Sequence, residues 1–218
     1  MKPVFYQIFA CFLLFSQISN LYAQTDSAKI YRETEAFLTA AIADFDGKRY
    51  QKSLMSLDKA IHHNNHPPLQ NILYYYKSLT LAQLENFQGA LVYMDSAISF
   101  LGDESKPHYY QQRADYYYQF QNWEAALKDY EQVLKSQPQN AAAHVRVGIL
   151  NLRSNHPAAA IEKFKTGLDL DGSISEGYYY RAFAYFQLIE PQKACADLQK
   201  AQALNYPLAQ PAIKNYCK

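Results

Sequence analysis

The sequence predicts an all-α protein, a right-handed α-solenoid of about five helix hairpins with a short C-terminal capping helix. Two observations carry this prediction. The chain repeats itself with a period of about 34 residues, which is the length of a helix–turn–helix repeat. Only seven Gly and nine Pro occur in 218 residues, which disfavours an all-β protein with many tight turns.

Residues 1–23 have the order of a secretory signal peptide. One lysine precedes an apolar stretch from Val4 to Phe15, and the small residue Ala23 stands before Gln24, as a signal-peptidase site requires. We therefore predict cleavage after Ala23, a mature chain without a transmembrane segment, and export to the periplasm, the outer-membrane periphery or the medium. An uncleaved anchor is the alternative, but the apolar stretch has only about 12 residues against the roughly 20 of a spanning helix.

Residues 24–33 form a lead-in, residues 34–206 carry the repeats, and residues 207–218 are interpreted as the capping helix. The five repeats begin at Thr34, Asn71, Pro107, Ala141 and Ser175. Their spacings are 37, 36, 34 and 34 residues, and the extra residues fall between repeats. Insertions between helix hairpins are what a stacked array tolerates best.

Within each repeat, small and large residues alternate at fixed positions. Position 20 is small: Ser53, Ala90, Ala126, Ala160 and Ala194. Position 24 is large: Leu57, Met94, Tyr130, Phe164 and Leu198. Position 27 is mostly small: Ala60, Ala97, Val133, Gly167 and Ala201. Residues three and four apart share one helix face, so these positions predict a second helix that packs closely on its neighbours.

The start of each second helix follows from local chemistry. Position 17 holds Tyr50, Phe87, Trp123, Pro157 and Pro191. Proline suits the first helical position because its missing N–H has no intrahelical partner there. We therefore predict that the second helix of every hairpin begins at position 17.

This pattern resembles the tetratricopeptide repeat. It is best kept in residues 111–138, QQRADYYYQFQNWEAALKDYEQVLKSQP, and nearly as well in residues 178–204; the first repeat is degenerate, with Asp44 at position 11. The resemblance implies a non-catalytic protein-interaction scaffold, here of the bacterial cell envelope. It also implies that the first helix of each hairpin lines a concave surface on which a protein or peptide segment binds.

In the family, positions 2, 5, 9, 12 and 13 face the bound partner, and positions 5, 9 and 12 form one stripe along the first helix. The partner-binding residues predicted from this resemblance are Tyr75, Leu79, Gln111, Asp115, Tyr118, Val145, Ile149, Tyr179, Phe183 and Phe186. Most of them are apolar or aromatic, and tyrosine is enriched at protein interfaces. Two alternatives stay open. Tight coiling of the array would bury these residues, and a glycan-binding protein would stack sugars on the tyrosines, with Gln111, Asp115 and Gln119 as polar contacts.

Two cysteines, Cys195 and Cys217, remain after cleavage. Position 21 is apolar in the first four repeats and is Cys195 in the last, where it should face the capping helix that contains Cys217. Export to an oxidising compartment then predicts a disulfide between them; two free thiols in a reducing compartment are the alternative.

Lipid attachment at Cys11 is a weaker alternative to cleavage of the signal peptide after Ala23, because apolar residues continue beyond Cys11.

Two repeats pair an arginine at position 7 with an aspartate at position 23. We predict that Arg113 pairs with Asp129, and Arg181 with Asp197, as ion pairs across their hairpins. An exposed pair of this kind contributes at most about 1 kcal/mol. The arginines are thus structural residues.

Other functions are disfavoured by what the sequence lacks. Net charge is +1 without a basic run, so there is no electrostatic case for nucleic-acid binding. No nucleophile-elbow, zinc-protease or P-loop motif occurs, so we predict neither an enzyme nor a cofactor. His62, His63 and His66 are the densest group of metal-ligand types, but no Cys or carboxylate lies among them, and a solvated loop is the better interpretation.

Overall fold

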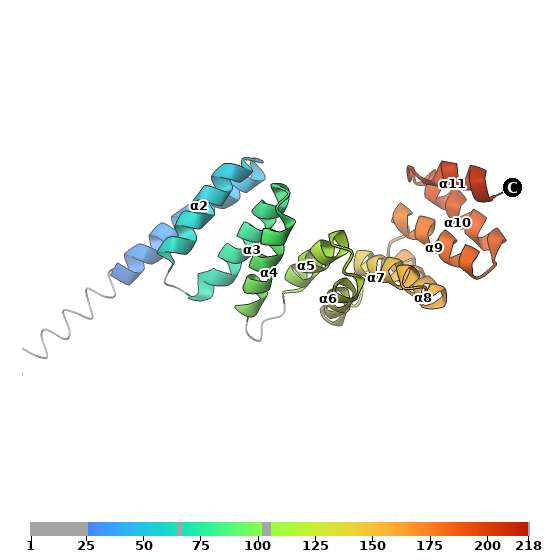
Figure 1. The fold of residues 1–218 in the computed structure, drawn as a ribbon, viewed down its shortest axis with the longest axis horizontal. Helices are drawn as coiled ribbons and strands as arrows, with labels where there is room; N and C mark the ends of the chain where they lie inside the picture. Colours follow the sequence, from blue (N-terminus) through green and yellow to red (C-terminus); the bar gives the residue numbers. More distant parts are fainter. Residues whose placement is uncertain (1–25, 65–66, 102–105, 218) are drawn as a thin grey trace, which may run out of the picture. The chain divides into compact units, whose positions relative to one another are not determined.

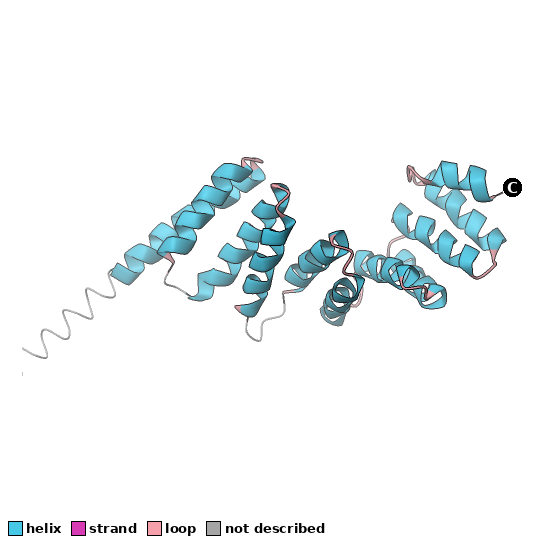
Figure 2. Ribbon diagram, in the orientation of Figure 1, coloured by secondary structure: helices cyan, strands magenta, loops and turns pink. Residues whose placement is uncertain are grey.

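The computed structural model describes residues 26–64, 67–101 and 106–217, and every regular element in these ranges is a helix (Figure 2). The predicted signal peptide, residues 1–23, lies outside them. Contacts divide the chain into two compact bodies, Met1–Gly102 and Asp103–Lys218, called here the N-terminal and C-terminal bodies. Among the described residues, no helix combines the length and the hydropathy that crossing a bilayer requires.

The N-terminal body contains two helix hairpins (Figure 1). Residues 26–46 form one helix, followed by α2 (Tyr50–His63), α3 (Pro67–Gln83) and α4 (Phe87–Ser99). The helix α3 packs against both α2 and α4. The buried core joins the first hairpin to α3 through Leu38, Ala41, Leu57, Ala60 and Leu73.

The C-terminal body contains three hairpins and a final short helix (Figure 1). Its helices are α5 (Pro107–Gln119), α6 (Trp123–Ser136), α7 (Ala141–Arg153), α8 (Pro157–Leu170), α9 (Ser175–Gln187), α10 (Pro191–Ala203) and α11 (Ala209–Tyr216). Consecutive hairpins stack, because α6 contacts α7 and α8 contacts α9, and α11 packs against α10. The predicted fold class, helix hairpins stacked in series with a capping helix, is confirmed.

Every second helix begins at the predicted residue, position 17 of its repeat. The side chains of Asn86 and Asn122 accept hydrogen bonds from the backbone N–H groups of Gly89 and Ala125, which caps α4 and α6. Proline occupies the first turn of α8 and α10 instead. Local chemistry therefore determines these boundaries.

One turn geometry closes all five hairpins. Each turn has three residues, and the middle one adopts a left-handed conformation with φ between 56° and 62°: Lys48, Glu85, Gln121, Asn155 and Ile189. The next residue in the chain donates its N–H to a carbonyl near the end of the first helix, at 2.7–2.9 Å. Ile189 stands out, because a β-branched residue is strained in this region and its side chain is 87% exposed.

Close packing within the hairpins follows the predicted pattern. The residues at positions 20 and 24 are at most 1% exposed in all five repeats. Glycine is required at position 8 of the fourth repeat, because a Cβ on Gly148 would lie 2.8 Å from the ring of Phe164. The small and large residues thus interlock between neighbouring helices.

The two predicted ion pairs are present, and their aspartates are buried rather than exposed. The Nε and Nη2 atoms of Arg113 donate to the two carboxylate oxygens of Asp129 at 2.7 and 2.8 Å. Arg181 binds Asp197 with the same geometry. Both aspartates are buried, at 3% and 7% exposed, so each pair is a bidentate link within a hairpin rather than a surface contact.

The C-terminal helix is tied to the last hairpin. The structure has a bond between the sulfurs of Cys195 in α10 and Cys217 at the end of α11, with a Cα–Cα distance of 5.7 Å. Beneath this link, Ala212 of α11 joins a buried cluster with Ala182, Ala194 and Leu198. The last hairpin is therefore covered on its outer side by the chain's own end.

Candidate functional site

Two residues of the predicted binding set are buried, and that part of the prediction is wrong. Val145 and Ile149 of α7 are 2% and 0% exposed. They belong to a core cluster that also contains Leu152, Phe164 and Ala184. They cannot contact a partner without unfolding the body.

Neighbouring hairpins cover this inner face of α7. Tyr118 from α5, and Tyr180 and Phe183 from α9, pack against the cluster that contains Val145 and Ile149. Gly177 lets α9 approach closely, because a Cβ there would lie 2.9 Å from Leu168 Cδ2 and 3.2 Å from Val145 Cγ2. Tight coiling, one of the two alternatives, therefore holds for α7.

Tyrosines from three elements remain partly exposed around this buried face. They are Tyr118 on α5, Tyr179 and Tyr180 on α9, and Tyr206 in the connection from α10 to α11, and we call these four residues the tyrosine surface. The Tyr179 ring lies 5.3 Å from the Tyr180 ring and 4.8 Å from the Tyr206 ring, between centroids. Tyr118 and Tyr180 pack on the same buried cluster.

Two arginines and a glutamate flank the tyrosine surface. Arg146 Nη1 donates to Glu176 Oε1 at 3.2 Å, and its guanidinium lies 5.7 Å from the centroid of the Tyr118 ring. Arg153 lies 5.8 Å from the same ring and 4.9 Å from the ring of Trp123. These are cation–π distances, so the arginines are held against aromatic rings.

Asp115 of α5 interacts with Arg146 and with the buried Tyr130. The buried hydroxyl of Tyr130 donates to Asp115 Oδ1. Burial raises the pKa of the Asp115 carboxyl, and the Tyr130 hydrogen bond and the charge of Arg146 offset part of that rise. Burial, followed by the negative charge of Asp115, raises the pKa of Tyr130 far above its usual range.

Burial also raises the pKa values of three residues of the tyrosine surface, Tyr179, Tyr180 and Tyr206. The pKa of Tyr206 is raised to about 12, first by burial and then by the neighbouring Tyr180 and Glu176. The pKa of Tyr180 is raised by burial and by Tyr118, and that of Tyr179 by burial. The hydroxyls of these tyrosines therefore keep their protons at neutral pH.

The remaining predicted site residues divide between the bodies. Phe183 and Phe186 are half-buried beside Tyr216 of α11, whose ring centroid is 5.8 and 5.5 Å from theirs. Gln111 is partly exposed on α5. Tyr75 and Leu79 are partly buried in the N-terminal body.

Sequence reasoning missed Tyr180, Arg146 and Tyr206. Tyr180 and Arg146 occupy position 6, next to the position 5 residues that were selected. Tyr206 is position 32 of the last repeat, outside positions 5, 9 and 12, from which the binding residues were selected. A search for tyrosine and arginine at position 6 would have found the first two.

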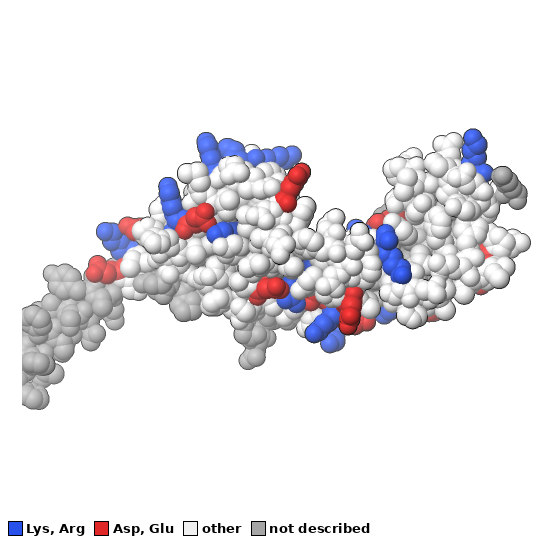
Figure 3. Space-filling model, in the orientation of Figure 1, with Lys and Arg blue, Asp and Glu red and all other residues white. Residues whose placement is uncertain are grey.

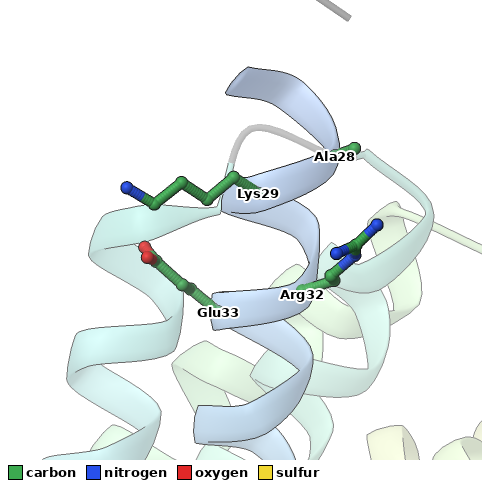
Figure 4. A pocket seen from close by; sticks show the side chains of 4 residues that line it. All are labelled: Ala28, Lys29, Arg32 and Glu33. Atoms are coloured by element: carbon green, nitrogen blue, oxygen red, sulfur yellow. The ribbon is translucent and has the colours of Figure 1, made fainter. Parts of the chain in front are cut away.

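Other surface features offer less. Shallow depressions of about 300 and 320 Å³ are lined by residues 28–33 of the first helix and by residues 48–52 with Leu84. The side chains of Ala28, Lys29, Arg32 and Glu33 come from one helix and spread apart around it (Figure 4). On the face drawn in Figure 3, basic and acidic side chains are interspersed among large uncharged areas.

Metal-ligand types do not gather in the described part of the chain. There, no three His, Cys, Asp or Glu side chains come together as a metal site would require. His62 and His63 lie at the end of α2, and His66 lies outside the described residues. The structure thus adds no argument for metal at this loop.

Fold and surface together define a helical-repeat scaffold that presents aromatic and charged side chains. Residues 112–173 match the family described as "Tetratricopeptide repeat". The TPR repeat-containing protein MJ1428 of Methanocaldococcus jannaschii is 32% identical over 83 residues, which is 38% of this chain but only 14% of that protein. The resemblance seen in the sequence is confirmed for residues 112–173, which match the tetratricopeptide repeat.

Solved structures of the same fold extend this likeness. MamA 41-end from Desulfovibrio magneticus RS-1 has a TM-score of 0.71 at 17% identity, covering 79% of this chain and 95% of that one. YrrB, described as a TPR protein with an unusual peptide-binding site, has a TM-score of 0.73 at 16% identity, covering 87% and 97%. At these identities the likeness concerns the fold alone.

Proposed function

We propose that this protein is a non-catalytic scaffold that holds a segment of another protein on the tyrosine surface. The observation that carries the proposal is the gathering of side chains from α5, α7, α9 and the α10–α11 connection on one surface of the C-terminal body. Tyrosine buries much area at low entropic cost and keeps a polar hydroxyl, which makes it an effective interface residue. The description of YrrB, a protein of the same fold, as having a peptide-binding site supports this proposal.

The glycan alternative has less support. Sugar hydroxyls need acceptors, and the carboxylates beside the tyrosine surface are already engaged: Asp115 with Tyr130, and Glu176 with Arg146. Bound sugars would stack on the rings and pair with the tyrosine hydroxyls, but each of these carboxylates has only one oxygen left for the charge-assisted hydrogen bonds that sugar hydroxyls donate. A protein segment is the better occupant.

We further propose that the scaffold acts in the bacterial envelope after cleavage behind Ala23, at the periphery of a larger assembly. The sequence of residues 1–23 and the bond between Cys195 and Cys217 support an oxidising location. The mass of the protein purified from envelope extract should correspond to a chain beginning at Gln24. A mass that includes residues 1–23 would contradict export by cleavage.

Cross-linking in cells tests the binding surface. A photoreactive amino acid in place of Tyr206 should cross-link one envelope protein. The same replacement at Tyr50, a partly exposed tyrosine of the N-terminal body, is the matched control and should not. Equal cross-linking at both positions would contradict the proposal.

A variant then tests whether the surface itself holds the partner. Arg153→Glu reverses an exposed charge, and with the photoreactive residue at 206 it should lower the cross-linking yield about tenfold, in line with loss of one strong contact. The melting temperature should stay unchanged, because Arg153 contacts the Tyr118 and Trp123 rings from outside the core. An unchanged yield would mean that the partner binds elsewhere.

A further inference from the structure

The helix α11 has little packing of its own on the last hairpin. Of its eight residues, only Ala209 and Ala212 are buried, whereas α7 buries eight of its 13 residues. Among the described residues, no hydrogen bond or ion pair joins α11 to α9 or α10. A helix this short is only marginally stable by itself in water. The bond between Cys195 and Cys217 is therefore the main restraint on its position.

Both ends of this segment support rings of the tyrosine surface. The Tyr206 ring packs on the Tyr179 ring with 4.8 Å between centroids. The carbonyl of Tyr206 accepts a hydrogen bond from the N–H of Ala209, at the start of α11, at 3.1 Å. At the other end, the Tyr216 ring packs on Phe183 at 5.8 Å, and Phe183 packs on Tyr179 at 5.0 Å. The docked α11 thus supports Tyr179 directly through Tyr206 and indirectly through Phe183.

The other half of the tyrosine surface lies on the core of the body. Tyr118 and Tyr180 pack against the buried cluster around Phe164. Arg146 of α7 donates to Glu176 of α9 at 3.2 Å. If α11 left the hairpin, these residues would keep their places, and only Tyr179 and Tyr206 would lose their support. A surface built in this way can be altered at one end without unfolding the body.

Resting on the proposed function, we propose that the bond between Cys195 and Cys217 is a reversible latch that controls how tightly the tyrosine surface holds its partner. With the bond closed, Tyr179 and Tyr206 stay together and the partner is held. With the bond open, α11 leaves the last hairpin, the Tyr206 ring separates from the Tyr179 ring, and the affinity falls. An oxidising compartment closes the latch, and a protein dithiol opens it.

The opening reaction is thiol–disulfide exchange. A thiolate of the dithiol attacks the Cys217 sulfur, forms a mixed disulfide with it and displaces Cys195 as a thiolate, which takes up a proton. The second thiol of the reductant then attacks the mixed disulfide, so the reductant leaves as a disulfide and Cys217 becomes a thiol. In total, two electrons and two protons pass from the dithiol to the cysteine pair. Both cysteines are partly exposed, so we expect the reductant to reach the bond in the folded body.

The first experiment follows the latch without a partner. The mature chain has no cysteine besides this pair, so dithiothreitol acts on this bond alone. In native buffer it should free both thiols and accelerate hydrogen exchange in α11 about tenfold, because local opening no longer works against the bond. The helix α7 should stay protected, and reoxidation should restore slow exchange in α11. The control is Cys195→Ser with Cys217→Ser, in which α11 should exchange fast with or without dithiothreitol.

Other results of this experiment would overturn the latch. If the bond reacts with dithiothreitol only after urea has unfolded the body, it is a permanent link. If α11 keeps its slow exchange after both thiols are free, packing alone holds the helix. If α7 loses its protection together with α11, the bond supports the whole body and does not act locally.

The second experiment connects the latch to the partner. A photoreactive amino acid replaces Tyr118, which does not depend on α11, and the yield of the cross-linked envelope protein is measured. Replacing both cysteines by serine should lower this yield about tenfold, within the usual range of coupling between two sites. Lys214→Ser changes an exposed residue of α11 and keeps the bond, so this matched control should leave the yield unchanged.

The outcomes separate this inference from the proposed function. Equal yields with and without the bond would overturn the latch while the proposed function stands. A higher yield without the bond would mean that α11 covers the binding site, and it would overturn the direction of control. No cross-linking at position 118 or 206 with the bond intact would overturn the proposed function, and control of binding with it.

Discussion

At the scale of single residues, Asp115 shows how the site is held at some cost to stability. Its carboxyl pKa is raised above the ordinary value of 3.8, chiefly by burial. A group with a raised folded-state pKa stabilises the fold fully below its unfolded pKa and loses that contribution as pH rises through the folded pKa. The ionised Asp115 therefore opposes folding at neutral pH.

Asp115→Asn should make the protein more stable at pH 7 but not at pH 3. The amide oxygen can still accept from Tyr130, and no charge is buried, so we expect a gain of about 1 kcal/mol in the free energy of unfolding at pH 7. Urea denaturation at the two pH values measures the difference between the variant and the unaltered chain. A gain of equal size at both would show that ionisation of Asp115 is not the cause.

The buried pair of Arg113 and Asp129 makes the opposite contribution. Asp129→Asn leaves the Arg113 charge without its bidentate partner in a buried setting, so the free energy of unfolding should fall by about 3 kcal/mol. The control is Glu190→Gln, which breaks the exposed pair with Lys193 and should cost less than about 0.5 kcal/mol. Denaturant titration compares them, and similar losses would contradict the role of burial.

Sequence alone found these pairs because both partners recur at fixed repeat positions. The sequence did not show that Val145 and Ile149 are buried whereas Tyr118 is partly exposed, although all three residues belong to the stripe at positions 5, 9 and 12. Their exposure depends on how near the adjacent hairpin comes, and Gly177 sets that approach between α7 and α9. A pattern within one repeat carries no information about the distance to the next.

At the scale of helices, boundaries were predictable wherever a cap or a proline marks them. All five second helices start at the expected residue. An asparagine cap or a proline in the first turn specifies the start of four of them, α4, α6, α8 and α10, whereas α2 begins at Tyr50 without either. The described part of the first helix extends from residue 26 to residue 46, so it includes most of the lead-in before the predicted repeat start at Thr34. The sequence predicted the capping helix, but it did not predict the contacts that the rings of Tyr206 and Tyr216 make with α9.

The cross-link between α10 and α11 should contribute to stability and to order at the end of the chain. Replacing Cys195 and Cys217 by serine opens a loop with a separation of 22 residues and should lower the free energy of unfolding by about 3 kcal/mol. Hydrogen exchange should accelerate in α11, while α7 stays protected. Alkylation of two free thiols in protein taken from the envelope would show that the bond does not form there.

At the scale of the molecule, the repeat pattern predicts one array from residue 34 to residue 206, whereas the contacts define two bodies. Periodicity reports that each hairpin exists. The period does not predict which neighbouring hairpins share a core, because the residues between repeats follow no pattern. The buried clusters within the C-terminal body are built only from its own residues.

The C-terminal body should therefore fold alone. A chain of residues 103–218 should be helical by circular dichroism and should melt cooperatively, because its three hairpins and α11 supply their own core. It should bind the partner as the full chain does, since the whole tyrosine surface lies within it. A fragment that is unfolded or lacks binding would show that the N-terminal body is required.

The uniform three-residue bends have a consequence for how such a chain can change length. Each requires one left-handed residue and one backbone hydrogen bond at a fixed place, so an added residue would break the closure and rotate the following helix out of register. The segments joining one hairpin to the next already differ in length along this sequence. Foreign peptides or labels are thus best inserted in the segments between hairpins, where added residues leave every helix pair intact.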